Sequence, residues 1–586
     1  MNLKQVFPFL TWVGELKDRN VLRADVIAGI TVALVLIPQS MAYAQLAGLP
    51  AYFGLYISFM PVMIAALWGS SRQLATGPVA VVSIMTATAL APIATSPEHY
   101  IALAMFMALL VGLFQFFLGV FRLGLVVNFL SHPVIVGFTN AAALVIGLSQ
   151  LSKIFGVTMP GNASDHFMGR IWGVLEQVGL SHIPTLLMGV STLLLMLLIK
   201  RYFVKAPCVL YAVVLSTVIS WLIGFESMGG KVVGIIPEGL PNLEVPLFSI
   251  DLAITLLPSA IVIALVGFME AISIAKAMAA QTKDHIDPNQ ELIGQGLGNI
   301  AGSFTQAYPA SGSFSRSAVN LNAGALTGFS SVVTAIIVVI TLLFLTPMLY
   351  HLPQAVLAAV IMLAVFGLIN FKAVKHAWQA NKHDGIASIV TFIATLGFAP
   401  HLDQGILLGA GLAIGLYLYR TMSPRIAFLG RFEDGTLRDI SVHTELPVDE
   451  KVVAVRFDGS LYFANVSYFE EAILAAAANH QEAKFILVVG DGINLLDASG
   501  EEVLHHLVQR LHDNGVTLVF SGLKRQILKV MIKTNLIELI GKQNIHATAD
   551  QALEAIYQQL DAAADGEVYC PLRPGFKAEN YKRIES

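Results

Sequence analysis

Long apolar runs recur over the first 420 residues, and they constrain the fold more than any other feature of the sequence. Hydrophobic residues make up 56% of the chain and charged residues 13%, with a mean hydropathy of +0.71. This balance is far from that of a soluble domain. Eleven runs have the length of a membrane span: 24–45, 50–69, 100–121, 125–147, 183–199, 206–224, 252–279, 327–346, 352–370, 384–399 and 404–420. Three shorter or Gly/Pro-broken segments cover 77–91, 289–302 and 312–325. We therefore predict an α-helical polytopic membrane protein with fourteen transmembrane segments.

Lysine and arginine residues gather on one side of the predicted membrane. With a cytoplasmic N-terminus, sixteen of them, including Lys200 and Arg201, lie on the cytoplasmic side and three lie in outer loops. This asymmetry follows the positive-inside rule. We expect a multi-pass protein of a cell inner membrane, with the lipid bilayer as its surroundings and both termini in the cytoplasm.

The density of charged residues changes near Thr421. Residues 1–421 carry 35 charges, whereas the much shorter stretch 422–586 carries 39. The predicted parts are a cytoplasmic N-terminus (1–23), a transmembrane transporter domain (24–421), a linker (422–440), an α/β domain (441–565) and a C-terminal tail (566–586).

Charge and cysteine content exclude several classes of protein. A net charge of −4 gives no reason to expect a nucleic-acid partner. Cys208 and Cys570 fall in different predicted domains, which argues against a disulfide framework or a cysteine metal cluster. We expect no metal and no cofactor.

Two broken segments occupy matching places in the membrane domain. One opens with Ala75-Thr-Gly-Pro-Val-Ala80 and the other with Ala310-Ser-Gly-Ser-Phe-Ser315. Each is third in a block of seven segments, and because seven is odd the second block crosses the membrane in the opposite sense. Matched interruptions in inverted halves are typical of the central site of a transporter. The alternative is that these residues only kink helices or allow close packing.

Arg316 follows the second interruption at membrane depth. A cation there is costly unless it meets a partner or lines a polar cavity. Because Pro309, Gly312 and Ser313 favour a helix start, we predict a half-helix whose N-terminal amides and Arg316 face a cavity that suits an anion. An arginine that reaches a lipid headgroup, or a structural ion pair, is the alternative.

From Lys451 the pattern changes to short strands and amphipathic helices. Predicted strands cover 452–457, 461–463, 485–489 and 516–521, and predicted helices cover 467–479, 499–514, 524–534 and 549–560.

The whole chain resembles the SulP family of anion transporters, the solute carrier 26 group. The motifs are Asp25-Val-Ile-Ala-Gly, Ile37-Pro-Gln-Ser-Met-Ala-Tyr43, Leu49-Pro-Ala-Tyr-Phe-Gly-Leu-Tyr56 up to Arg72, and Ser313-Phe-Ser-Arg-Ser-Ala-Val-Asn320 with Asn322-Ala-Gly324. The resemblance implies seven plus seven inverted repeats, a core that moves against a gate in an elevator-like cycle, a homodimer and a cytoplasmic STAS domain.

The resemblance also implies which residues bind the substrate. They are Gln39 and Tyr43 of the first span, Thr76, Gly77, Pro78 and Val79 of the third, and Ser311, Ser313, Phe314, Ser315 and Arg316 of the tenth. Gln39 and Tyr43 lie four apart on one helix face and can donate hydrogen bonds to an oxyanion. Hydrogen bonding between helices remains an alternative for this pair, and simple helix capping remains one for the side chains of the other two segments.

Glu270 is the acidic residue in the middle of the eighth predicted span. An ionised carboxylate there is costly, so we expect a protonated form or a nearby cation. In SulP proteins similar to plant sulfate transporters, a glutamate at this place couples anion uptake to protons, and a pair with Arg316 would link the two. Sodium coupling and a purely structural role toward Arg316 stay open.

In the tail, Asp497-Ala-Ser-Gly500 resembles the STAS signature turn. The position phosphorylated in bacterial anti-sigma antagonists is Ala498 here, so that phosphoswitch is not expected. Ser499 is expected to cap the helix, and the exposed helix start either binds an anion or nucleotide or is a plain structural turn.

These observations favour a secondary active inorganic-anion transporter, with sulfate:proton symport as the leading hypothesis. The alternatives are a carrier of bicarbonate or C4-dicarboxylate, with or without sodium coupling, an uncoupled channel or exchanger, and a sensor with vestigial transport. The sequence shows neither a nucleophile–base constellation nor a Walker loop, so an enzyme or an ATP-driven pump is not expected.

Overall fold

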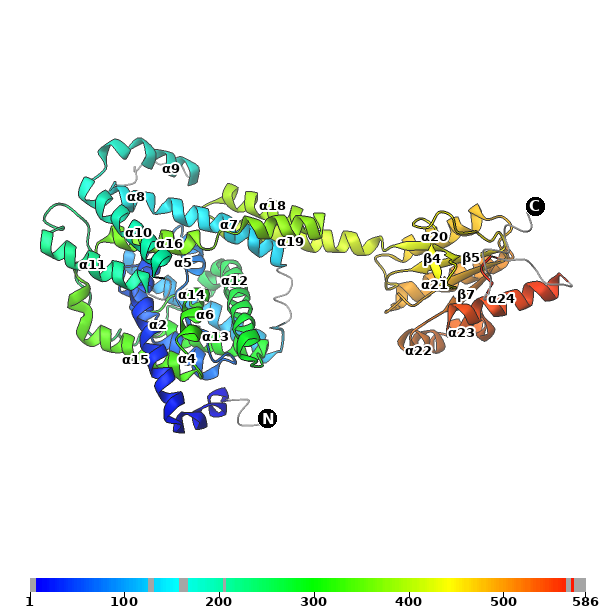
Figure 1. Cartoon of the computed structure of the whole chain (residues 1–586), viewed down its shortest axis with the longest axis horizontal. Coiled ribbons are helices and arrows are strands. Elements are labelled where there is room, and N and C mark those ends of the chain that lie inside the picture. Colours follow the sequence, from blue (N-terminus) through cyan, green and yellow to red (C-terminus); the bar gives the residue numbers. More distant parts are fainter. Residues whose placement is uncertain (1–6, 125–130, 158–166, 204–206, 565–570, 574–586) are drawn as a thin grey trace. The chain divides into compact units, whose positions relative to one another are not determined.

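The computed structural model describes residues 7–124, 131–157, 167–203, 207–564 and 571–573. The chain divides into two compact units between Ile414 and Gly415. The first unit is almost entirely helical, and the second has a β-sheet with helices packed on it (Figure 1).

Eight helical segments among the described residues are long and apolar enough to cross a membrane. They comprise α2 (Arg19–Leu46), α6 (Pro97–Val120), α7 (His132–Ser149) with α8 (Leu151–Phe155), α10 (Ile183–Tyr202), α12 (Ile250–Thr282), α15 (Phe329–Ile340) with the turns that follow it, α16 (Gln354–Phe366) with α17 (Phe371–Ala380), and α19 (Leu402–Met422).

Shorter helices complete the first unit. They are α3 (Phe53–Tyr56), α4 (Met60–Trp68), α5 (Ala80–Leu90), α9 (Phe167–Glu176), α11 (Cys208–Ile223), α13 (Pro288–Ser303), α14 (Phe314–Asn322) and α18 (Lys382–Phe398). Each of the fourteen predicted ranges contains helix, although residues 125–130 and 206 lie outside the described part. The number of complete membrane crossings stays a prediction.

Polar residues fix several helix ends. Ser96 precedes Pro97 at the start of α6 and accepts a hydrogen bond from the His99 amide at 3.2 Å. Asp287 does the same for α13 and accepts from the Asn289 amide at 2.9 Å. Such caps satisfy amides that the first helical turn leaves free.

The helices of the first unit pack as two groups. In one group α13 packs against α6 and α4, α12 against α6, and α2 against α15. In the other, α18 packs against α7, and α10 packs against α16 and α11. The groups meet where α16 and α11 contact α2, and the candidate site lies there.

The second unit is a six-stranded sheet of order β4-β3-β5-β6-β7-β8. Strands β5 (Val452–Phe457), β6 (Phe485–Val489), β7 (Thr517–Ser521) and β8 (Ile545–His546) run parallel, and β3 (Ile426–Arg431) is antiparallel to β5 and β4 (Leu437–Asp439).

Helices cover both faces of this sheet (Figure 1). Apolar side chains alternate along β5, so Val453 and Val455 face one core and Val452 and Ala454 face the other. The first core is closed by α20 (Val466–Asn479), α21 (Ala498–Asp513), α22 (Arg525–Lys533) and α23 (Leu536–Ile540), and the second by α24 (Ala549–Ala563).

Three expectations for the second unit differ from the structure. Residues 422–440 do not form a simple linker, because β3 and β4 lie there and join the sheet. Residues 461–463 form no strand, and Leu461 makes only an isolated bridge with Leu496. In the predicted tail, Leu572 is buried in the second core and its carbonyl accepts from Arg431 Nε at 2.9 Å. Cys570 lies outside the described residues.

Candidate functional site

Two very short strands cross inside the helical unit. β1 (Thr76–Gly77) pairs antiparallel with β2 (Ser311–Gly312), with Thr76 opposite Gly312 and Gly77 opposite Ser311. The Ser313 amide extends this pairing by donating to the Ala75 carbonyl at 3.0 Å. α5 and α14 begin directly after the two strands, so the structure brings together the two interrupted segments that the sequence matched.

Glycine is needed at both strands of the crossing. Gly77 has a φ of +145°, and a Cβ on it would lie 3.2 Å from Arg316 Nη2. A Cβ on Gly312 would lie 2.9 Å from Leu74 Cδ1 and 3.0 Å from the Ala271 backbone. A side chain at position 77 would thus press on the Arg316 guanidinium, and one at position 312 would press on Leu74 and on Ala271 of α12.

Neither half-helix is capped by a side chain. Val79 precedes α5 and has no polar atom in its side chain, and Ser313 precedes α14 without making a side-chain cap. The Ser313 hydroxyl is instead 3.4 Å from that of Ser315. The alternative that side chains there only cap the helices therefore finds no support, and the first-turn amides keep the positive ends of both helix dipoles available.

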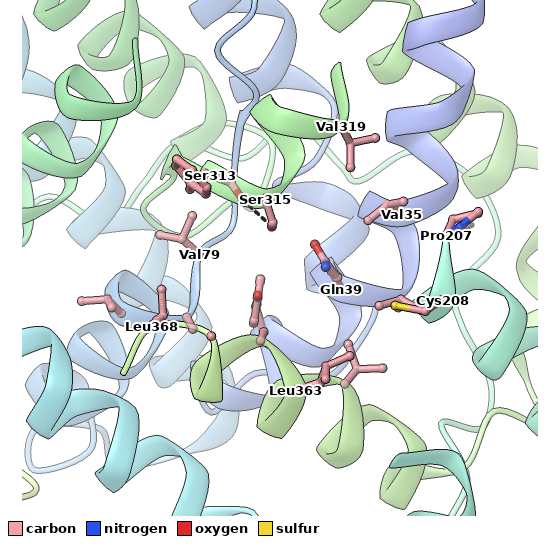
Figure 2. Close-up of a pocket in the computed structure, with 18 of the residues that line it drawn as sticks. Val35, Gln39, Val79, Pro207, Cys208, Ser313, Ser315, Val319, Leu363 and Leu368 are labelled. Atoms are coloured by element: carbon pink, nitrogen blue, oxygen red, sulfur yellow. Dashed lines mark hydrogen bonds between the residues drawn. The ribbon is translucent and has the colours of Figure 1, made fainter. Parts of the chain in front are cut away.

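A cavity of about 460 Å³ lies against these two helix starts. Its polar lining comes from α2, α12 and the start of α14, with Lys200 from the end of α10, and its apolar lining comes chiefly from α5, α11 and α16. In Figure 2 the side chains of Gln39, Val79 and Ser315 surround one space that Leu363 and Cys208 border from other sides. Seven of the predicted site residues line it: Gln39, Tyr43, Val79, Glu270, Ser313, Phe314 and Ser315.

Gln39 and Tyr43 lie on the face of α2 that borders the cavity. Both are largely buried, and Gln39 Oε1 has no hydrogen-bond partner among the described residues. Pro38 directly before Gln39 lacks an amide hydrogen and weakens the helix there. The geometry therefore leaves the polar groups of this turn available to a ligand rather than to a neighbouring helix.

Arg316 does not line the cavity, which corrects the expectation that its side chain faces it. The residue is fully buried, and Nη1 donates to the Pro78 carbonyl at 2.9 Å. Nε and Nη2 have no partner among the described residues. Ser315 and Val319 take the cavity face of α14, whereas Arg316 and Asn320 share the face packed on the segment before α5. The guanidinium thus lies behind the strand crossing.

Glu270 and Arg316 form no ion pair within 4.0 Å, and the salt bridges of the described residues do not include either side chain. Their charges are still near enough to interact through space. Glu270 is partly exposed to the cavity. Its carboxyl group is therefore open to a solute in the cavity.

The remaining predicted residues support the crossing and do not line the cavity. Thr76 Oγ1 accepts from Gln295 Nε2 at 2.7 Å, and Ser311 Oγ donates to the Gly267 carbonyl at 2.6 Å. Gly77 and Pro78 contact Arg316 as described above. These four residues position the half-helices.

Several cavity residues were not anticipated from the sequence. Lys200 lies at the end of α10, and Pro207, Cys208 and Val209 lie at the start of α11. Others belong to α16: Val360, Leu363, Ala364, Gly367 and Leu368, the last two just beyond its end. Of these residues, only Lys200 could have been noticed in the sequence, because its charge places it at a membrane boundary.

The signature turn of the second unit is capped by Asp497, which corrects the expectation for Ser499. Asp497 Oδ1 accepts from the Gly500 amide at 2.8 Å, and Oδ2 accepts from the Phe463 amide at 2.9 Å. The side chain therefore joins the start of α21 to the loop before α20.

A helical membrane bundle that encloses a polar cavity between two uncapped helix starts has the organisation of a multi-pass transporter. A model of the sulfate permease family matches residues 22–391, and a model of the STAS domain matches residues 443–552. The chain belongs to the sulfate permease family and carries a C-terminal STAS domain.

Curated relatives match over almost the whole chain. Probable sulfate transporter 4.2 of Arabidopsis thaliana is 35% identical over 606 residues, which cover 99% of this chain and 88% of the relative. Sulfate transporter 4.1, chloroplastic, of the same plant is 36% identical over 578 residues, covering 95% and 83%. These relatives are named as transporters, and not as enzymes.

Solved structures share the fold. The structure titled "The overall structure of SLC26A9" aligns with a TM-score of 0.88 at 22% identity, covering 96% of this chain and 94% of that one. The transmembrane domain of a cyanobacterium bicarbonate transporter, BicA, aligns with a TM-score of 0.59 at 24% identity, covering 68% and 98%.

Proposed function

We propose that this protein is a sulfate:proton symporter that works by an elevator-like alternating-access cycle. The observation that carries the proposal is the cavity at which two uncapped helix starts meet polar side chains and the carboxyl group of Glu270. The curated relatives, named as sulfate transporters, favour sulfate among small oxyanions.

The anion would sit between the starts of α5 and α14. Backbone amides of both first turns, the Gln39 amide and the hydroxyl groups of Tyr43, Ser313 and Ser315 supply hydrogen-bond donors without a full charge. Arg316 adds its positive charge from behind the crossing, where low dielectric preserves its field. Nε and Nη2 have no hydrogen-bond partner among the described residues, so the contribution of Arg316 is its charge and not a direct bond to the anion.

Glu270 is the proposed proton-binding group. When it is ionised, its negative charge opposes an anion in the same cavity, and protonation removes that repulsion. Proton and anion then bind with positive coupling, and by linkage each raises the affinity of the other.

The contact pattern supports seven plus seven inverted repeats. In such a repeat, each segment corresponds to the segment seven places further along, counted in a circle. The pair α6–α13 then corresponds to α15–α4, the pair α5–α12 to α14–α2, and the pair α7–α18 to α16–α10. All six pairs are in contact. We propose fourteen membrane segments, an inner-membrane location, cytoplasmic termini and a homodimer. Lys200 at the cavity then indicates an opening toward the cytoplasm.

Purified protein in liposomes tests the function directly. Radiolabelled sulfate should accumulate against its gradient when an inward proton gradient is imposed, and a proton ionophore should abolish this. Accumulation that follows a sodium gradient at fixed pH would contradict proton coupling. If bicarbonate or a C4-dicarboxylate competes at a lower concentration than unlabelled sulfate, that anion is the preferred substrate. Sulfate flux that does not depend on an ion gradient would indicate a channel or exchanger.

A further inference from the structure

One face of α13 carries three buried polar side chains that the anion proposal does not use. Glu291, Gln295 and Asn299 are spaced four residues apart and are 1%, 2% and 1% exposed. This spacing places them in a row along the helix. We call them the α13 polar row.

Glu291 holds the chain before the first strand of the crossing. Its Oε2 accepts from the Ser70 amide at 2.9 Å, the Ser71 amide at 3.0 Å and the Ser70 hydroxyl at 3.1 Å. A carboxylate with this many donors is satisfied without a basic partner. The segment between α4 and β1 is therefore fixed to α13.

Gln295 holds β1 itself, and Asn299 holds the residue directly before β2. Gln295 Nε2 donates to Thr76 Oγ1 in β1 at 2.7 Å. Asn299 hydrogen-bonds to both backbone groups of Ala310, the residue directly before β2. Its Oδ1 accepts from the Ala310 amide at 2.7 Å, and its Nδ2 donates to the Ala310 carbonyl at 3.1 Å. Asn299 Nδ2 also donates to Gln115 Oε1 of α6 at 3.0 Å.

An external support is needed because each strand has only two residues. A two-stranded pairing of this length is not stable by itself. The starts of α5 and α14 keep their direction only if something else fixes the strands that precede them. The polar row is attached to β1 and to the residue directly before β2, and it belongs to one helix packed between α6 and α4.

We propose that Glu291, Gln295 and Asn299 are positioning residues that set the spacing and direction of the two helix starts at the anion. They touch no cavity-lining atom and act through β1 and β2. The inference rests on the proposed anion site between α5 and α14.

Gln290 is a matched control within the same helix. It is half-buried, and its Nε2 donates to the Trp68 carbonyl of α4 at 2.7 Å. It therefore supports the packing of α13 on α4 but does not contact the crossing. A merely structural role of α13 predicts similar effects for Gln290→Leu and Gln295→Leu.

The test compares these variants in the reconstituted full chain by sulfate transport kinetics and by hydrogen exchange of peptides over 72–80 and 308–318. In Gln295→Leu and Asn299→Leu, we expect the KM for sulfate to rise about tenfold, because a buried partner is left unpaired and the site loosens. The same variants should exchange faster at the crossing. Gln290→Leu should change neither the KM nor the exchange. Asn299→Asp should not restore the KM, because its carboxylate keeps an acceptor for the Ala310 amide but loses the donor to the Ala310 carbonyl and to Gln115 Oε1.

Thr76→Val removes the Gln295 bond from the strand side while α13 stays intact, which covers a Gln295 variant that fails to fold. If positioning is correct, Thr76→Val raises the KM, and adding Gln295→Leu raises it little further. Unchanged KM and exchange in Thr76→Val, or equal effects from Gln290→Leu, overturn the proposal. The polar-row variants can loosen the crossing while Arg316→Ala still binds sulfate normally. In that case the proposed anion site is wrong, but the inference that the polar row supports the crossing stands.

Discussion

The two walls of the central cavity differ in chemistry. The wall formed by α2, α12 and the start of α14 carries the polar groups Gln39, Tyr43, Glu270, Ser313 and Ser315. The facing wall from α11 and α16 is mostly apolar, with Val209, Val360, Leu363, Ala364 and Leu368. The hydrogen-bonding groups are thus concentrated on one helix group, and the other group borders the cavity mostly with apolar side chains.

This difference fits a movement of one wall along the other. Apolar contacts are non-directional, so a shift between packed helices breaks no specific hydrogen bond at that surface. Under the proposed function, the polar wall must keep its geometry while it carries the anion. The α13 polar row lies in the same helix group as the polar wall, which is where such rigidity is required.

The largest expected effect comes from Arg316→Ala. The variant removes the buried charge behind the crossing and the bond to the Pro78 carbonyl, so sulfate accumulation should fall roughly a hundredfold or more. Arg316→Lys keeps the charge and should retain part of the uptake. Expression and detergent-solubilised size should stay close to wild type in both. Wild-type uptake and affinity in Arg316→Ala would contradict the role proposed for the Arg316 charge at the anion site.

Glu270→Gln separates binding from coupling on the same wall. The amide imitates a permanently protonated carboxyl group, so exchange of labelled for unlabelled sulfate should persist. Accumulation driven by an inward proton gradient should be lost, because no group at this position titrates. For the wild type, sulfate affinity should weaken as pH rises and Glu270 ionises, and the variant should lose this dependence. Proton-driven accumulation that survives in Glu270→Gln would make the glutamate structural.

A pair of substitutions compares the two walls directly. Gln39→Leu removes a hydrogen-bonding group and should weaken sulfate affinity about tenfold. Leu363→Ala shortens an apolar side chain on the opposite wall and should change affinity less than about twofold, although it leaves a cavity with a cost in stability. Binding isotherms and thermal unfolding of both variants distinguish these effects. Equal losses of affinity would mean that both walls recognise the anion.

The sequence predicted the polar wall better than the apolar one. Gly/Pro-broken segments and an isolated intramembrane acid are conspicuous against an apolar background, so the half-helices and Glu270 were identifiable. The side of α14 on which Arg316 lies depends on the residue at which that helix begins, and a two-residue error in this start rotates the side chain by more than half a turn. Leu363 and Cys208 look like any lipid-facing residues, because only tertiary packing places them at the cavity.

Similar limits explain the differences in the second unit. The pattern of β5, β6 and β7 is a continuous apolar run typical of buried parallel strands, and those strands were predicted. β3 and β4 lie at the edge of the sheet among charged residues such as Arg431 and Asp439, and they resembled a linker. Residues 461–463 have a suitable composition for a strand, but only Leu461 finds a bridging partner.

Lys200 tests whether the cavity has an electrostatic entrance. It is exposed and lines the cavity, whereas the adjacent Arg201 is also exposed and does not line it. In inside-out vesicles at low ionic strength, Lys200→Gln should raise the KM for sulfate about threefold, and salt should reduce the difference by screening. Arg201→Gln has the same charge change and should leave the KM near wild type. An equal effect of both variants would indicate a general surface potential.

The smallest expected effect on recognition comes from removing the second unit. A cut at residue 440 would leave β3 and β4 without the strand that β3 pairs with, exposing edges that favour aggregation. Deletion of residues 424–586 removes the whole sheet and is the better variant. Because all cavity-lining residues lie in the first unit, the ratio of sulfate to bicarbonate uptake per molecule should be unchanged, while assembly and protein level fall. A changed ratio at equal protein level would place part of the anion selectivity in the STAS domain. It would contradict the proposal that the first unit alone recognises the anion.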